Sequence, residues 1–217
     1  MRGLYAITPE MLDTIRLSTE VRAAIAGGAS AVQYRNKRGD DRLAHQQATA
    51  IRAITLANGV LFIVNDNIDL ALSVGADGVH LGREDTDTHA IALLRERCGT
   101  RNAGGRLIIG VSCYNELTRA DAAVQAGADY VAFGSFFTSR TKPNAVKADV
   151  SLIGAAKARF GVPVVAIGGI TVENAPQLIS ANIDAVAVIS ALFDADDIEQ
   201  RARDFTQLFK AQNHVQQ

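Results

Sequence analysis

Short, continuous apolar runs recur along the chain, and a longer stretch of mixed hydrophobic and polar residues follows each of them. A continuous apolar run of this length is typical of a parallel strand that is buried on both faces. The pattern predicts eight strands, each followed by a helical segment. The predicted strands span roughly residues 4–8, 30–35, 61–66, 78–82, 107–112, 130–135, 163–168 and 185–190.

A repeated unit underlies four of these strands. An alanine-rich stretch ends at Gly28, Gly75, Gly127 or Asn182, and a β-rich run begins a few residues later. Glycine and asparagine best tolerate the left-handed backbone that closes a helix. The four starts lie 47, 52 and 55 residues apart, and such a period indicates repeated supersecondary units.

Alternating strands and helices predict a parallel sheet, and eight such units fit a small α/β fold of the (β/α)8 TIM-barrel type. We therefore expect residues 1–217 to form a single TIM-barrel domain. A doubly wound open sheet is the structural alternative, but a repeat of like units favours closure of the sheet into a barrel. No linker or low-complexity segment divides the sequence.

The composition narrows the cellular setting. The formal net charge of −1 lacks the basic excess of a dedicated nucleic-acid binder, so no nucleic-acid partner is expected. Two cysteines, Cys98 and Cys113, form neither a disulfide framework nor a metal-finger spacing, which favours a reducing compartment. No signal peptide is visible, and no apolar stretch approaches the ~20 residues that span a bilayer. We expect a cytoplasmic protein with no membrane partner and leave its oligomeric state open.

Carboxylates follow two neighbouring predicted strands at their C-terminal ends, the side of a TIM barrel that carries the active site. Asp66 ends the third strand and Asp85 follows the fourth. Mg²⁺ takes one or two carboxylates and completes its shell with water and substrate phosphates, so the pair is a candidate magnesium site. The alternative for each residue is a helix N-cap or a first-turn acid.

Hydrogen-bond donors surround these carboxylates in the predicted barrel. They are Gln33, Arg35, Lys37, Asn65 and Lys142. Arginine offers a planar fork to phosphate oxygens, and lysine offers a compact charge. A metal within a ring of cations indicates a diphosphate site.

A second anion site is predicted after strands seven and eight, where TIM barrels often bind a phosphate. Gly168-Gly169 and Ile189-Ser190 occupy these positions, although a glycine pair also serves simply to turn the chain. The polar stretch from Ser139 to Asn144 follows strand six and could join the two anion sites. A solvated surface loop is the alternative for that stretch.

Two further residues with reactive side chains lie in or directly beside predicted strands. His80 more often represents a histidine with satisfied hydrogen bonds in the core than a catalytic base. Cys113 has no neighbouring histidine in the sequence, so a nucleophilic role is not expected.

Taken in order, these motifs resemble the thiamine phosphate synthase family over nearly the whole chain. The similarity of each segment alone is weak evidence, but the whole set in this order is specific for the family. The segments are Gln33-Tyr34-Arg35-Asn36-Lys37, Val64-Asn65-Asp66, the run from Gly75 to Asp85, Gly110-Val111-Ser112, Thr141-Lys142-Pro143 and the run from Ala166 to Ile170.

The resemblance implies a transferase of thiamine biosynthesis with two small-molecule substrates. The family condenses 4-amino-2-methyl-5-hydroxymethylpyrimidine diphosphate with a thiazole phosphate, often carboxylated, and releases diphosphate. Asp66 and Asp85 are expected to bind Mg²⁺, and Arg35, Lys37 and Lys142 to act on the departing diphosphate. The expected pyrimidine diphosphate contacts are Gln33, Tyr34, Arg35, Asn36, Lys37, Asn65, Ser112 and Lys142. The expected thiazole phosphate contacts are Ser139, Arg140, Thr141, Gly169, Ile189 and Ser190.

The sequence departs from the family pattern at a few positions. Thr138-Ser139 stands where the family usually has Pro-Thr, Arg140 places a cation in the variable slot, and Arg83 replaces the usual glutamine. The competing interpretations are a thiazole tautomerase of the same barrel family, a phosphosugar isomerase or epimerase, and a non-catalytic thiamine phosphate binder. Among these activities, only the synthase would use both carboxylates, Asp66 and Asp85, and both predicted anion sites.

Overall fold

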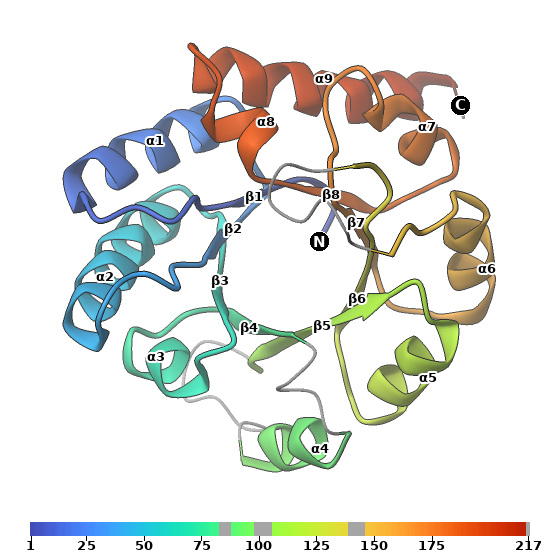
Figure 1. Ribbon diagram of the computed structural model, residues 1–217, viewed down its shortest axis with the longest axis horizontal. Coiled ribbons are helices and arrows are strands. Elements are labelled where there is room, and N and C mark those ends of the chain that lie inside the picture. The colour runs from blue at the N-terminus through green and yellow to red at the C-terminus, as the bar shows by residue number, and fades with distance from the viewer. Residues whose placement is uncertain (83–87, 98–105, 139–145, 216–217) are drawn as a thin grey trace.

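A closed barrel of parallel strands forms the centre of the molecule. The computed structural model describes residues 1–82, 88–97, 106–138 and 146–215, and within them strands β1 to β8 pair in sequence order until β8 meets β1. Figure 1 shows the strands as an inner ring with the helices outside it. The predicted single-domain (β/α)8 barrel is confirmed.

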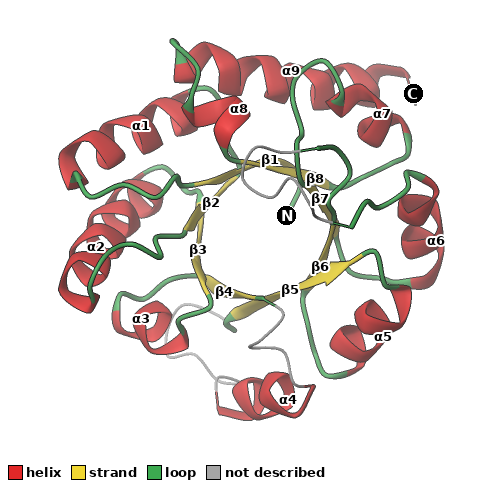
Figure 2. Cartoon of the chain, viewed as in Figure 1, coloured by secondary structure: helices red, strands yellow, loops and turns green. Residues whose placement is uncertain are grey.

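The strands agree closely with the predicted runs, and Figure 2 separates them from the surrounding helices. The strands are β1 (Gly3–Ile7), β2 (Ala31–Tyr34), β3 (Leu61–Asn65), β4 (Gly78–Leu81), β5 (Ile108–Tyr114), β6 (Tyr130–Phe133), β7 (Val164–Ile167) and β8 (Ala185–Val188). The helices are α1 (Thr14–Ala26), α2 (Asp41–Ala57), α3 (Ile68–Ser73), α4 (Thr88–Arg97), α5 (Leu117–Gln125), α6 (Ser151–Arg159), α7 (Ala175–Ser180), α8 (Ser190–Phe193) and α9 (Ile198–Val215). Among these helices, none combines the length and hydrophobicity needed to cross a bilayer.

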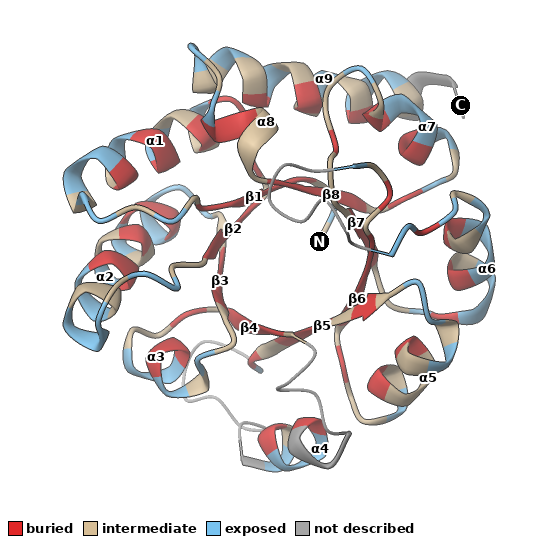
Figure 3. Cartoon of the chain, in the orientation of Figure 1, coloured by how far each residue is buried: buried red, intermediate tan, exposed pale blue. Residues whose placement is uncertain are grey.

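Alternation along each strand divides the core into two layers. Residues facing outward pack against the helices, and those facing inward fill the barrel, where Tyr5, Ile63, Tyr130 and Val165 are buried together. Figure 3 shows buried residues along the strands and on the inner faces of the helices, with exposed residues outside. In β2 this alternation directs Gln33 inward and Tyr34 outward.

An aspartate two residues after Gly75, Gly127 or Asn182 joins neighbouring strands at the end of the barrel opposite the C-terminal mouth. In three units its carboxylate accepts a hydrogen bond of 2.7–2.8 Å from a backbone N–H near the start of the preceding strand, and it pairs with a cation from a helix. The three sets are Asp77 with Phe62 and Arg52, Asp129 with Ile109 and Arg95, and Asp184 with Val164 and Lys157. The repeat therefore supports the fold and lies away from the mouth.

Candidate active site

The carboxylate of Asp66 is fixed at the mouth of the barrel, immediately after β3. Its Oδ1 accepts a hydrogen bond of 3.0 Å from the Gly82 N–H at the end of β4, and its Oδ2 accepts one of 2.6 Å from Asn65 Nδ2. The backbone of Asp66 has a φ of 58°, a left-handed conformation that aspartate tolerates better than most residues. Such a conformation requires support from its surroundings, which these two hydrogen bonds supply.

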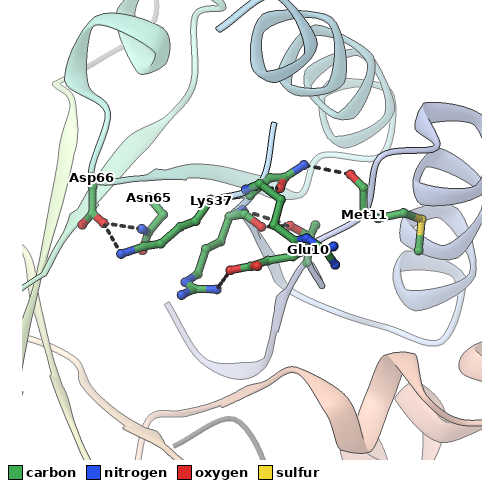
Figure 4. Close-up of polar contacts among 9 residues, drawn as sticks. Glu10, Met11, Lys37, Asn65 and Asp66 are labelled. Carbon is green, nitrogen blue, oxygen red and sulfur yellow. Dashed lines mark hydrogen bonds and ion pairs between the residues drawn. The ribbon is translucent and has the colours of Figure 1, made fainter. Parts of the chain in front are cut away.

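Lys37 brings a cation to the same carboxylate. Its Nζ lies 3.8 Å from Asp66 Oδ2, and its side chain is 62% exposed, so it is accessible from solvent. Figure 4 shows Lys37 extending toward Asp66 beside Asn65. A hollow of about 190 Å³ adjoins this pair, between the ends of β2 and β3 and the helices α2 and α3, and its lining residues include Tyr34, Asn36, Lys37, Asn65 and Asp66. The structure thus brings together five of the predicted site residues from the ends of β2 and β3.

Arg35 is held at the mouth by residues that follow β1. Its Nη1 lies 2.9 Å from Glu10 Oε1, and its backbone N–H donates to Thr8 Oγ1 at 2.9 Å. The Thr8 hydroxyl in turn donates to the Arg35 carbonyl, and Thr8 is almost wholly buried. This clamp fixes the backbone of Arg35 while leaving its guanidinium at the rim.

The side chains of Tyr34 and Asn36 are engaged with the outer layer of the protein. The Tyr34 hydroxyl donates to Gln47 Oε1 on α2 at 2.9 Å, and Asn36 Nδ2 donates to the Met11 carbonyl and to Gln47 Oε1. Burial raises the pKa of Tyr34 to about 12. These contacts anchor the loop that carries Arg35 and Lys37, and the predicted substrate contacts of Tyr34 and Asn36 stay predictions.

Gln33 and Ser112 belong to a connected set of side chains inside the barrel. We call this set the barrel network; its members are Gln33, Tyr5, Tyr130, His80 and Ser112. Burial raises the pKa of both tyrosine hydroxyls, and it lowers the pKa of His80 to about 4 against a smaller opposing effect of the Asp66 charge. The network is therefore uncharged near neutral pH, and His80 is a core residue with both ring nitrogens hydrogen-bonded, as predicted.

The glycine pair after β7 packs against the segment that follows β6. A Cβ at Gly168 would overlap Ser135, and one at Gly169 would overlap the backbone of Phe137 and Thr138. Both glycines have positive φ, of 101° and 63°. The close approach brings Thr138, which directly precedes the polar stretch from Ser139 to Asn144 in the sequence, against the end of β7.

The other predicted thiazole phosphate residues divide into two groups. Ile189 and Ser190 stand directly after β8, the hydrogen-bonded neighbour of β7, so they share the side of the mouth that carries Gly169. The loop after β7 is tied by Asn174, which donates to the Gly169 carbonyl at 2.9 Å. Asp85, Ser139, Arg140, Thr141 and Lys142 lie outside the described residues, as does Arg83.

Comparison with known proteins decides the family. The profile described as "Thiamine monophosphate synthase" matches residues 4–192, most of the chain. The chain belongs to the thiamine monophosphate synthase family. A "Thiamine-phosphate synthase" of Thiobacillus denitrificans is 50% identical over 210 residues, which cover 97% of this chain and 96% of that relative. Its counterpart in Methylobacillus flagellatus is 52% identical over 210 residues, with 96% of each chain covered.

Solved structures agree with the family assignment. A thiamine phosphate pyrophosphorylase from Pyrococcus furiosus has a TM-score of 0.83 and 34% identity, with 96% of both chains covered. A 3-hexulose-6-phosphate synthase from Salmonella typhimurium has a TM-score of 0.71 at 21% identity, and it shares the fold alone. The family relationship makes this protein an enzyme, a transferase of thiamine biosynthesis.

The residues of the family site fit a magnesium ion in their chemistry. Asp66 is a partly exposed carboxylate with a side chain that is 27% exposed, and each of its oxygens keeps lone-pair capacity beyond one hydrogen bond. Hard oxygen ligands and few carboxylates suit Mg²⁺. Within the described ranges, no cluster of three or more His, Cys, Asp or Glu side chains is arranged to hold a metal.

Four residues at the site were missed by sequence reasoning. Thr8 and Glu10 follow β1, and the signal for them in the sequence is the polar segment Thr8-Pro9-Glu10 at the end of the first predicted strand. Tyr5 and Tyr130 are strand aromatics, which a sequence pattern presents as ordinary core residues. Only the closure of the barrel brings their hydroxyls together.

Proposed function

We propose that this enzyme condenses 4-amino-2-methyl-5-hydroxymethylpyrimidine diphosphate with a thiazole phosphate, plain or carboxylated, in a magnesium-dependent reaction. The products are thiamine phosphate and diphosphate, with CO2 as well when the carboxylated thiazole phosphate is used. The near-neutral charge and the two cysteines support a cytoplasmic location.

The observation on which the proposal depends is the pairing of Lys37 with Asp66 at the barrel mouth. A carboxylate that holds a metal and a cation that faces a polyanion need to lie close together, and here Nζ and Oδ2 are 3.8 Å apart. Both are solvent-accessible, so neither is committed to a buried ion pair. A diphosphate can therefore replace Asp66 as the partner of Lys37 without leaving a charge stranded in the core.

Cations at the mouth supply the electrostatics for diphosphate departure. Arg35 and Lys37, together with Lys142 in the loop after β6, stabilise the negative charge that grows on the leaving group. A bound Mg²⁺, held by Asp66 and Asp85, would neutralise part of that charge. Asn65 donates a hydrogen bond to the Asp66 carboxylate, so its amide would lie beside the same leaving group.

The thiazole phosphate occupies the other side of the mouth in this proposal. Gly169, Ile189 and Ser190 contact its phosphate from β7 and β8, and Ser139, Arg140 and Thr141 contact it from the polar loop. Support comes from the packing of Thr138, the residue directly before Ser139, against Gly169 at the end of β7.

No protein nucleophile takes part in the proposed reaction. The carbon–oxygen bond to diphosphate breaks first, and the thiazole nitrogen then bonds to the pyrimidine methyl cation. Cys113, the cysteine within the described residues, is buried, and burial raises the pKa of its thiol to about 12. The protein contributes positioning and electrostatic stabilisation.

An endpoint assay tests the proposal. Purified protein is mixed with the pyrimidine diphosphate, the thiazole phosphate and Mg²⁺, and thiamine phosphate is measured by its oxidised fluorescence. We expect product only when both substrates are present. A folded protein that gives no product would refute the proposal. Conversion of the thiazole carboxylate phosphate alone would then assign the tautomerase activity instead.

A further inference from the structure

The barrel network crosses the interior of the barrel from β2 to β5. Gln33 Nε2 donates to Tyr5 Oη at 2.7 Å, and the Tyr5 and Tyr130 hydroxyl oxygens are 3.0 Å apart. Tyr130 Oη lies 2.9 Å from His80 Nδ1, and His80 Nε2 lies 2.9 Å from Ser112 Oγ. Five side chains from five strands therefore form one continuous path.

Gly110 makes the central contact of this path possible. His80, Gly110 and Tyr130 are register partners on β4, β5 and β6. A Cβ at Gly110 would overlap the Tyr130 ring, so the glycine leaves the space that the ring fills. The ring reaches across β5 and stacks on His80, with centroids 5.6 Å apart and an interplanar angle of 25°.

The requirement that a buried hydrogen has an acceptor selects one direction for the path. Each phenol has one hydrogen, and the Gln33 amide already donates to Tyr5. Either phenol could donate across the Tyr5–Tyr130 contact, but if Tyr130 donated there, the buried Tyr5 hydrogen would have no acceptor among the described residues. Tyr5 therefore donates to Tyr130, and Tyr130 donates to His80 Nδ1. A neutral imidazole that accepts at Nδ1 carries its hydrogen on Nε2, which donates to Ser112 Oγ. The Ser112 hydroxyl keeps its own hydrogen for a further acceptor.

Gln33 and Ser112, at the two ends of the path, are the members that can still form further hydrogen bonds. Gln33 Oε1 has no hydrogen-bond partner among the described residues, and the Ser112 hydroxyl contacts only His80 there. Ser112 is half-buried, whereas Tyr5, Tyr130 and His80 are buried. The path therefore ends in an acceptor at β2 and a donor at β5, each able to bond a ligand.

We propose that Tyr5, Tyr130 and His80 are positioning residues that set Ser112 as a hydrogen-bond donor and Gln33 as an acceptor toward one substrate. The substrate class is an aminopyrimidine, whose amino group donates to Gln33 Oε1 and whose ring nitrogen accepts from Ser112. This assignment rests on the proposed function for the identity of the substrate. The direction of the path is independent of it and is tested separately.

The first test reads the tautomer of His80 without any substrate. In a variant with His45, His89 and His214 all changed to Gln, His80 is the sole histidine, and its two ring nitrogens are assigned by ¹⁵N NMR at pH 7.5. We expect the hydrogen on Nε2. A hydrogen on Nδ1 would reverse the path and overturn the proposal, whether or not the protein makes thiamine phosphate.

The second test breaks the path at two places. Tyr130→Phe removes the donor to His80 Nδ1, so the tautomers should mix. Tyr5→Phe leaves that donor in place, so the Nε2 tautomer should persist. The matched control is Thr55→Val, which removes the hydroxyl of a fully buried residue on α2, outside the barrel. A pure Nε2 tautomer in Tyr130→Phe would contradict the proposal.

Kinetics separate positioning from general loss of structure. In Tyr130→Phe we expect kcat/KM for the pyrimidine diphosphate to fall about tenfold, the effect of one hydrogen bond to a neutral group, while KM for the thiazole phosphate stays unchanged. Equal losses for both substrates would show a structural role alone and overturn the proposal. If the wild type makes no thiamine phosphate, the proposed function fails, and the tautomer result still decides the direction of the path.

Discussion

A single glycine determines which polar side chains meet inside the barrel. Gly110 has no side chain, and its absence lets Tyr130 reach His80 across β5. Because Tyr130 and the surrounding residues are buried, the ring has little room to retreat from an added methyl group.

We predict that Gly110→Ala lowers the free energy of unfolding by about 1–3 kcal/mol, the usual cost of overpacking a core. Gly154→Ala is the matched control, because nothing lies within 4 Å of a Cβ at Gly154 on α6. The control should be slightly stabilising, since glycine disfavours helix interiors. Urea denaturation measures both, and a Gly110→Ala variant as stable as the wild type would show that Tyr130 moves freely.

Burial also determines the reactivity of Cys113. Its thiol lies in the outer core, where burial raises the pKa to about 12, so the reactive thiolate is scarce at pH 8. In a Cys98→Ser variant, we expect the native protein to react slowly with a disulfide reagent and the urea-unfolded protein to react fast. Equal rates in the two states would contradict this account of the site.

At the scale of the elements, an aspartate in three of the repeated units joins the unit to the strand before it. Asp184 accepts the Val164 N–H at 2.7 Å, and Lys157 Nζ lies within 2.8 Å of both its carboxylate oxygens. The same carboxylate therefore connects α6, β7 and β8 at the end of the barrel away from the chemistry.

We predict that Asp184→Ala lowers the free energy of unfolding by about 1–3 kcal/mol, because a strand N–H and a lysine lose their acceptor. Asp196→Ala, at an exposed position before α9, should change stability little. Activity at a temperature well below the unfolding midpoint should be retained in both variants. Loss of activity in a stable, folded Asp184→Ala protein would show that this end of the barrel communicates with the mouth.

At the scale of the whole molecule, closure of the barrel is what assembles the site. Strand periods and the repeated glycines predict the eight strands, and their C-terminal ends predict where Asp66, Lys37 and Arg35 gather. The sequence does not predict the barrel network or the Thr8 clamp, because both depend on which inward side chains face one another after closure. Tyr34 and Asn36 show the same limit: they adjoin site residues in sequence, yet their side chains contact α2 and the loop after β1.

The most direct test of the account is the magnesium dependence of thiamine phosphate formation in wild type and Asp66→Asn. Asparagine keeps the shape of the side chain and tolerates the φ of 58° at this position, so the fold should persist. Asp69→Asn, an exposed change three residues away on α3, is the control.

We expect wild type and Asp69→Asn to form product with Mg²⁺ and to stop in EDTA, and Asp66→Asn to lose magnesium-dependent turnover while its circular dichroism spectrum stays native. Near-normal turnover of Asp66→Asn at saturating Mg²⁺, or undiminished wild-type turnover in EDTA, would contradict the assignment of this carboxylate to the metal.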